Sequence, residues 1–280
     1  MEKTSVVQRK RFLKRRAQRA ARRVLPFLAS LFLATPLATS VSKSMAATAS
    51  STEVRMPRVA PTKAMLFDQR LRDQYAALNA EAQGLRYEVF EKAMTGYLNL
   101  RQAGQLADDR QVLTVVDFDL PSTEKRLWVF DLATNQTLFH TLVAHGHNTG
   151  ENEANSFSNV NQSNMSSLGF YVTGEEYEGK HGHSLHLNGM DEDFNTNAYS
   201  RSIVMHGADY VSEDFIRQYG RLGRSLGCPA LPMDQYSQII DAVTGGTCLF
   251  LNKSNAGYNS RYLDQATAIA ALTASSDYTS

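Results

Sequence analysis

Hydrophobic side chains recur at steps of three and four residues between residues 64 and 106. One run is Leu66, Phe67, Leu71, Tyr75 and Leu78, and a second is Val89, Phe90, Ala93, Met94, Tyr97 and Leu98. This spacing places apolar side chains on one face of a helix. The pattern predicts two amphipathic helices, broken near Gly84, whose aromatic positions belong to a hydrophobic core.

After Asp109 the hydrophobic period changes to two, which is typical of strands. Strands are predicted at residues 112–118, 126–132, 137–143, 169–173, 184–187, 201–205 and 247–251, and helices at 212–219 and 233–243. Ser212 is the expected N-cap of the first of these helices. Consecutive strands without alternating helices favour a mostly antiparallel β domain behind a helical segment, an α+β fold that is mainly β.

Residues 151–168 interrupt the strand pattern, because five Asn and five Ser leave little to bury. A polar loop of this length inside a compact domain is often functional. We expect it to border or cover a substrate groove, with disorder as the alternative.

The N-terminus has the composition of a secretory leader. Residues 1–23 carry ten Lys or Arg against one Glu, and an apolar run follows from Val24 to Ala34. The run is short for a membrane span. We predict a signal peptide at 1–46, cleaved near Ala46, with an uncleaved anchor as the alternative. Residues 47–63 are predicted as a linker, 64–108 as a helical segment packed on a catalytic domain at 109–254, and 255–280 as a C-terminal tail.

Removing the leader changes the charge balance of the chain. Residues 47–280 hold 18 basic against 27 acidic residues, a net charge of −9, although the whole chain is at +1. An acidic protein repels phosphate backbones, so nucleic-acid binding is not expected. After cleavage no stable membrane insertion is expected either, and the oligomeric state is left open.

One of the two cysteines lies in an unusual place, the segment GRSLGCPALP at 223–232. Cys228 stands in a Gly- and Pro-flanked turn that presents its side chain, whereas Cys248 lies in an apolar strand, where cysteine acts as a small hydrophobe. A Cys228–Cys248 disulfide is the alternative. A nucleophilic cysteine needs a proton acceptor. His206, at a predicted strand end before Gly207, is the best-placed candidate, with a buried structural histidine as the alternative.

The residues around Cys228 suit acyl transfer. Backbone N–H groups at a Gly227–Cys228 turn can point at a carbonyl oxygen that gains negative charge. Ser225 is either part of the catalytic machinery or a turn-stabilising hydroxyl.

These residues resemble the YkuD-type L,D-transpeptidases of bacterial cell walls, whose signature is a His-Gly pair followed by Ser/Thr-His-Gly-Cys-hydrophobic-Arg. The branch described as murein L,D-transpeptidase catalytic domain proteins, with Ser-x-Gly-Cys-Pro-Ala, is the most similar. Further similar stretches are residues 115–122, 125–128, 141–146, 167–174 and 203–207. The resemblance runs from about Phe67 to Leu251 and implies a β-sandwich or mixed-sheet catalytic domain.

The resemblance implies a role for each matching residue. Cys228 would form a thioester with a peptidoglycan stem peptide, His206 would be the general base, and the Gly207 carbonyl would orient its imidazole. The Gly227 and Cys228 amides would form the oxyanion hole, and the acyl group would pass to an amine. No metal or organic cofactor is implied, and the location is the periplasm or cell envelope.

Two signature residues are replaced: Leu226 stands where the family has His, and Ala230 where it has the Arg linked to active-site organisation. The positioning of a substrate carboxylate is therefore left open. Arg224 and Arg221 are the candidates for a replacement cation. His145, which ends an apolar strand in Ala-His-Gly-His-Asn, is a candidate groove or supporting residue.

Three other functions stay open. A zinc peptidase would use His145 and His147 with the cluster at 181–186, because His-x-His places two ligands on one strand face. A noncatalytic wall-binding protein would keep the fold without the chemistry. A carboxypeptidase or amidase would pass the same acyl group to water.

Overall fold

The computed structural model describes residues 60–254 and 257–276, which belong to one compact unit. The predicted leader and nearly all of the predicted linker lie outside the described residues. None of the helices described combines the length and the apolar character that a membrane crossing requires.

Two helices precede the sheet, as the hydrophobic pattern predicts. Helix α2 spans Lys63–Ala77 and α3 spans Tyr87–Gln102, with Gly84 in the connection between them. The Thr62 hydroxyl caps α2 by accepting from the Met65 amide, which satisfies one of the free N–H groups of the first turn.

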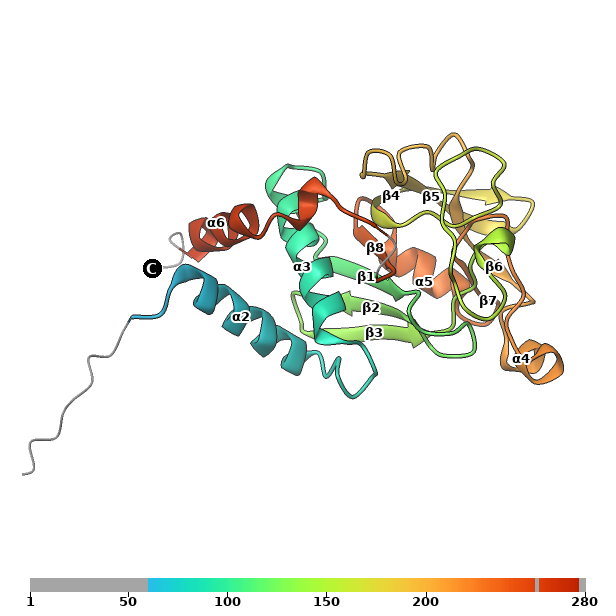
Figure 1. Cartoon of the computed structure of the whole chain (residues 1–280), viewed down its shortest axis with the longest axis horizontal. Helices are drawn as coiled ribbons and strands as arrows, with labels where there is room; N and C mark the ends of the chain where they lie inside the picture. The colour runs from blue at the N-terminus through green and yellow to red at the C-terminus, as the bar shows by residue number, and fades with distance from the viewer. Residues whose placement is uncertain (1–59, 255–256, 277–280) are drawn as a thin grey trace, which may run out of the picture. The chain divides into compact units, whose positions relative to one another are not determined.

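The eight strands of the described residues form one mixed sheet (Figure 1). The strands are β1 (Val112–Asp117), β2 (Leu127–Asp131), β3 (Gln136–Thr141), β4 (Gly169–Gly179), β5 (Gly182–Gly189), β6 (Val204–Ala208), β7 (Ala230–Pro232) and β8 (Cys248–Asn252). Their order is β3-β2-β1-β8-β4-β5-β6-β7, with only β1–β8 and β6–β7 parallel. The fold class is therefore confirmed, in its mixed-sheet form.

Each face of the sheet packs against its own core. On β1, Leu113 and Val115 join the core under α2 and α3, and Val112 and Val116 join the core that includes α5 (Tyr236–Val243). In Figure 1, α3 lies beside β1, β2 and β3. The alternation follows from the strand period of two.

The two edges of the sheet are joined by the segment that follows β3. Ala144 bridges Ala230 and Gly146 bridges Ser225, so the chain leaving the first strand in the order pairs beside the last. The sheet is nearly closed as a result. The 3-10 turn η2 (His147–Thr149) follows directly.

Several elements differ from the sequence prediction. The predicted strand 201–205 is wrong in its bounds, because Ser202 has a positive φ and β6 begins at Val204. The short strand β7 was not predicted. Helix α4 (Glu213–Tyr219) begins after the Ser212 cap, as expected.

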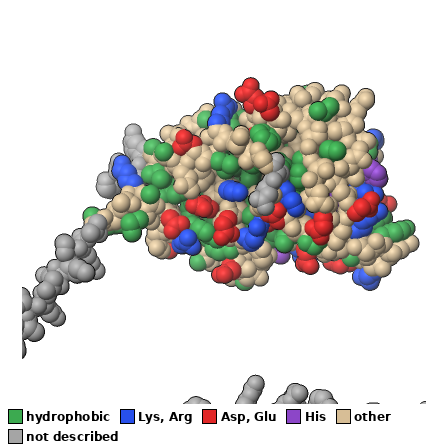
Figure 2. Space-filling model, viewed as in Figure 1, with side chains coloured by type: hydrophobic (Ala, Val, Ile, Leu, Met, Phe, Trp, Pro, Cys, Tyr) green, Lys and Arg blue, Asp and Glu red, His purple; other side chains and the backbone are tan. Residues whose placement is uncertain are grey.

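The segment predicted as a C-terminal tail contains regular structure. It carries the 3-10 turn η3 (Arg261–Leu263) and helix α6 (Gln265–Ser276). Helix α6 packs on α2 and α3, with Ala268 fully buried. Acidic and basic side chains are interspersed on the face shown in Figure 2.

Candidate active site

The cysteine turn lies between β6 and the segment that closes the sheet. The Ser225 amide donates to the His145 carbonyl at 3.0 Å, and the His147 amide donates to the Ser225 carbonyl at 2.8 Å. On the other side, Ala230 in β7 pairs with His206 in β6. Backbone pairing on both sides fixes the path of the turn.

Ser225 organises this turn through its hydroxyl. Its Oγ accepts from the Gly227 amide at 3.1 Å and donates to the Cys228 carbonyl at 2.7 Å. The Gly227 amide, one of the two expected oxyanion donors, is therefore engaged within the turn. This geometry favours the turn-stabilising interpretation of Ser225.

Position 227 requires glycine for two reasons. Its φ is +129°, and a Cβ there would lie 2.8 Å from both the Met165 carbonyl oxygen and the Ile203 side chain. The polar loop therefore packs directly against the backbone beside Cys228.

The Cys228 thiol is free and half-buried. Its Sγ lies 3.5 Å from the Val204 amide nitrogen and 3.7 Å from the Ser202 carbonyl oxygen. Burial raises the pKa of the thiol, while the Val204 amide and the charges of Arg201 and Lys180 lower it and offset the rise only in part. The thiol is therefore largely protonated at neutral pH.

The disulfide alternative is wrong for this structure. Cys248 is also free, and it lies fully buried in β8. Burial raises its pKa far above the usual range, so it acts as a core side chain.

His206 lies within β6, between Ser184 of β5 and Ala230 of β7, and is almost fully buried. Its Nδ1 lies 2.9 Å from the Gly207 carbonyl oxygen. Because a carbonyl only accepts, Nδ1 carries the proton and Nε2 keeps a lone pair. Burial lowers the pKa of the imidazole, although the Gly207 carbonyl raises it, so the neutral form is favoured.

Two neighbours complete the surroundings of His206. His181, exposed at the tip of the β4–β5 hairpin, stacks on the His206 ring with centroids 4.5 Å apart. A Cβ on Gly207 would lie 2.6 Å from the Tyr236 ring. Glycine at this position therefore makes room for the Tyr236 side chain of α5, and not for a substrate.

The structure brings Cys228 and His206 to neighbouring positions near the paired strands β6 and β7, without a hydrogen bond between them. Cys228 precedes by two residues the Ala230 that pairs with His206. Within the described residues, no hydrogen bond joins the thiol to the imidazole. Catalytic hydrogen bonds are often long in a free enzyme and tighten when substrate binds.

The two candidate substrate arginines are engaged by a carboxylate of the same chain. Arg224 Nη1 lies 2.8 Å from Glu151 Oε1, and Arg221 Nε lies 2.8 Å from Glu151 Oε2. Arg224 also donates to the carbonyls of His147 and Gly150. Both side chains therefore anchor the start of the polar loop in this structure.

His145 is buried rather than placed in a groove, with 1% exposure. Its Nδ1 accepts from Arg126 at 2.8 Å, and its Nε2 donates to the Gly150 carbonyl at 3.3 Å. Burial, together with the Arg126 charge, lowers the pKa of His145 to about 4. His145 is therefore neutral, and it supports the backbone at the end of η2 through its bond to Gly150.

The polar loop is held against the site by Arg201, which was not singled out from the sequence. The guanidinium donates to loop carbonyls and hydroxyls from Ser158 to Ser167. The loop therefore borders the cysteine turn, and the substrate groove expected beside it stays a prediction. In the sequence, Arg201 is a single arginine at the start of a predicted strand, near a loop rich in Ser and Asn. Sequence spacing does not show which groups such a side chain contacts.

The histidines of the zinc alternative do not converge. His145 is bound to Arg126, His181 stacks on His206, and His186 stacks on Tyr177. In the described part of the chain, the one group with metal-ligand spacing is Glu176, His183 and Asp241, whose donor atoms lie within 4.8 Å of one another. That group contains one of the predicted ligands, and His183 Nε2 already lies 2.6 Å from Glu176 Oε2.

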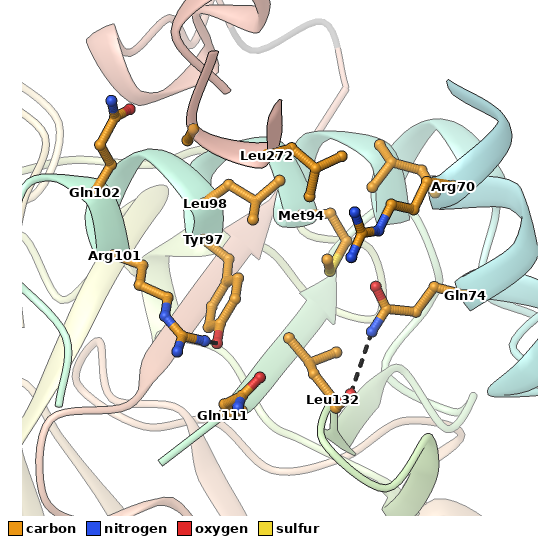
Figure 3. Close-up of a pocket in the computed structure, with 12 residues that line it drawn as sticks. Arg70, Gln74, Met94, Tyr97, Leu98, Arg101, Gln102, Gln111, Leu132 and Leu272 are labelled. Carbon is orange, nitrogen blue, oxygen red and sulfur yellow. Dashed lines mark hydrogen bonds between the residues drawn. The ribbon is translucent and has the colours of Figure 1, made fainter. Parts of the chain in front are cut away.

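One pocket, lined by side chains of the helical layer, lies away from this site (Figure 3). It has a volume of about 500 Å³ between α2, α3 and α6, and Met94, Leu98 and Leu272 contribute to its apolar wall. Neither Cys228 nor His206 lines it.

The fold and the site together define an α+β protein with a free cysteine in a Gly-Cys turn beside a His-Gly strand. The family model described as the L,D-transpeptidase catalytic domain matches residues 81–252, more than half of the chain. The chain belongs to this family. No curated protein matches it.

Solved structures with some similarity include two mycobacterial L,D-transpeptidases. The protein from Mycobacterium smegmatis is 13% identical, with a TM-score of 0.33, 51% of this chain covered and 59% of that one. The protein from Mycobacterium tuberculosis is 11% identical, with a TM-score of 0.31, 51% of this chain covered and 58% of that one.

The helical cell shape determining protein Pgp2 of Campylobacter jejuni, solved as a variant, is 14% identical, with a TM-score of 0.36, 66% of this chain covered and 63% of that one. This chain therefore spans about three fifths of the length of these proteins.

Proposed function

We propose that this protein is a cysteine-dependent L,D-transpeptidase that acts on peptidoglycan stem peptides in the bacterial cell envelope. The observation that carries the proposal is the Ser225–Gly227–Cys228 turn, paired in register with the strand of His206 and Gly207. Membership of the L,D-transpeptidase catalytic domain family supports the substrate class.

The first step is attack by the Cys228 sulfur on a carbonyl carbon of the donor stem peptide. Because the thiol pKa is raised and the imidazole pKa is lowered, the resting pair is neutral. His206 Nε2 takes the thiol proton as the C–S bond forms, and the imidazolium then gives it to the leaving amine as the C–N bond breaks. The Cys228 amide stabilises the oxyanion.

The second step passes the acyl group to an acceptor amine, such as that of a diaminopimelate side chain. The amine nitrogen forms a new C–N bond with the thioester carbonyl, and the C–S bond breaks. His206 takes the proton that the amine loses and returns it to the thiolate. Attack by water instead would give an L,D-carboxypeptidase, which is the second product of the same acyl-enzyme.

The test is incubation of the protein, without residues 1–46, with purified muropeptides, followed by mass spectrometry of the products. Cross-linked dimers are expected from the wild type, and trimmed monomers alone would show the hydrolase. Cys228→Ala is expected to abolish turnover, and His206→Ala to lower it by about 10²-fold or more. Cys248→Ala is the matched control and should keep its activity.

The rival functions are separated in the same assay. Alkylation of Cys228 should stop turnover and a chelator should not, whereas the reverse result indicates a zinc peptidase. Binding of muropeptides by the wild type without any product would indicate a noncatalytic wall-binding protein. Full activity in Cys228→Ala would overturn the proposal.

A further inference from the structure

Arg201 is the point at which the polar loop is fixed. Its Nη1 donates to the Ser158 carbonyl at 2.6 Å, and its Nη2 donates to the Met165 carbonyl at 2.6 Å and to Ser163 Oγ at 3.1 Å. Nη1 also donates to Ser167 Oγ. The planar fork of one guanidinium therefore orders both ends of a ten-residue stretch.

The charge of Arg201 has no acidic counterpart. In residues 60–254 and 257–276, no carboxylate forms an ion pair with it, whereas Arg224 and Arg221 share Glu151. Carbonyl and hydroxyl oxygens satisfy its N–H groups but leave the charge uncompensated. A half-buried cation in this state favours the anionic form of the acidic groups beside it, Tyr171 and Cys228. Burial keeps Tyr171 neutral by raising its pKa far above the usual range, which leaves Cys228.

The Cys228 thiol lies beside this cation. Its sulfur rests on the backbone of Ser202 and Val204, the residues that follow Arg201. A Cβ on Gly227 would lie 3.4 Å from Arg201 Nη2, so the guanidinium borders the Gly-Cys turn itself. In agreement with this geometry, Arg201 is the charged group that most lowers the pKa of Cys228.

Residue 230, which stands where the family signature has arginine, cannot supply a positive charge to the thiol. Ala230 is fully buried in β7 opposite His206, among small and apolar neighbours. A charged side chain there would have to be buried, at a large desolvation cost.

We propose that Arg201 is the positioning cation of this site, holding the loop 158–167 against the cysteine turn and stabilising the thiolate form of Cys228 in place of the signature arginine. The proposal rests on the proposed cysteine chemistry for its catalytic consequence. When the thioester breaks, the Cys228 thiolate that is released would lie next to the positive charge of Arg201.

Other ionisable groups also face the thiol. Lys180 is exposed at the hairpin tip, where solvent screens its charge, and it lowers the thiol pKa less than Arg201 does. Tyr210 has its pKa raised to about 12 by burial and by the thiol, so it is neutral. His206 is neutral as well. Arg201 is therefore the cation to test.

The test measures alkylation of Cys228 by iodoacetamide between pH 6 and 10, with labelling read from the Cys228 peptide by mass spectrometry. Arg201→Gln removes the charge, and we expect alkylation at pH 7 to be about 10-fold slower, with the pH profile moved to higher pH. Arg110→Gln is the control, because it removes a guanidinium that also donates to backbone carbonyls, those of Asp241 and Ala242, but not beside the cysteine turn. It should leave the profile unchanged.

Arg201→Lys tests the positive charge separately from the planar hydrogen-bonding geometry of the guanidinium. It keeps the cation, so alkylation should stay within about two-fold of wild type, while hydrogen exchange of residues 158–167 should increase. This variant also covers the case in which Arg201→Gln does not fold. A ten-fold loss in Arg201→Lys with an unchanged loop would overturn the proposal.

A folded Arg201→Gln with the wild-type alkylation profile would also overturn it. The measurement needs no substrate, so it stands apart from the muropeptide assay. A wild type that shows the alkylation behaviour but no muropeptide turnover would contradict the proposed function and leave the role of Arg201 supported.

Discussion

The hydroxyl of Ser225 joins two backbone groups of the cysteine turn, the Gly227 amide and the Cys228 carbonyl. Ser225→Ala leaves both without this partner in a nearly buried place. We expect a loss of about 1–3 kcal/mol in the free energy of unfolding, measured by urea denaturation, and a slower turnover because the thiol is displaced. Ser200→Ala, an exposed hydroxyl that bonds the Asn197 carbonyl, is the control. Equal stability in the two variants would contradict the role assigned to Ser225.

His145 makes the protein sensitive to acid. Its folded pKa of about 4 lies below the usual 6.5, so the unfolded chain binds a proton more readily. Its contribution to stability is complete above pH 6.5 and is lost as pH falls towards 4, at a cost of about 3 kcal/mol. Denaturation at several pH values should show this loss and a flatter dependence in His145→Gln. His147→Gln, at an exposed ring, should keep the wild-type slope.

The chemistry at single residues could be predicted where it is local in the sequence. The Gly-Cys turn and the His206–Gly207 pair stand in short motifs, so their chemistry follows from neighbouring residues. The partners of Arg224, Arg221 and Arg201 lie about 35 to 75 residues away. Such pairs cannot be predicted from sequence spacing, because only folding brings the two residues together.

At the scale of elements, strong periodicity was reliable and short strands were not. Helices α2 and α3 were both predicted; α3 buries a long apolar stripe, whereas α2 buries Phe67 and Leu71 and leaves Leu66 of the predicted run exposed. Strand β7 has three residues and ends in Pro232, so it has no period of its own and exists because β6 pairs with it. Helix α6 is rich in Ala, which favours a helix without giving a clear apolar face.

The anchoring of the polar loop by Glu151 is expected to be weak, because its side chain is 70% exposed. Glu151→Gln should change the free energy of unfolding only slightly, because solvent screens an exposed ion pair. Arg224→Gln should cost more, because Arg224 also donates to the His147 and Gly150 carbonyls. Thermal or urea denaturation of the two variants checks this order, and equal losses would contradict it.

At the scale of the molecule, the two sides of the sheet have separate tasks. Helices α2, α3 and α6 cover one face, whereas the cysteine turn lies at the β6–β7 edge. Truncation after Asp264 removes α6 and the buried Ala268. We expect the melting temperature to fall by about 5–10 °C, because apolar surface is exposed.

Alkylation of Cys228 should be unchanged in the same truncated protein at a temperature where it is folded. A truncation that left the melting temperature unchanged would show that α6 adds nothing to the core. A slower or faster alkylation would show that the helical layer influences the site.

The bridges from Ala144 to Ala230 and from Gly146 to Ser225 affect how the protein folds. They join a part of the chain made early in synthesis to a part made late. Such distant pairings form slowly, since much chain entropy is lost before they are gained. A nascent or half-folded molecule therefore lacks the arrangement of Cys228 beside the strand of His206, which forms once the chain has closed on itself.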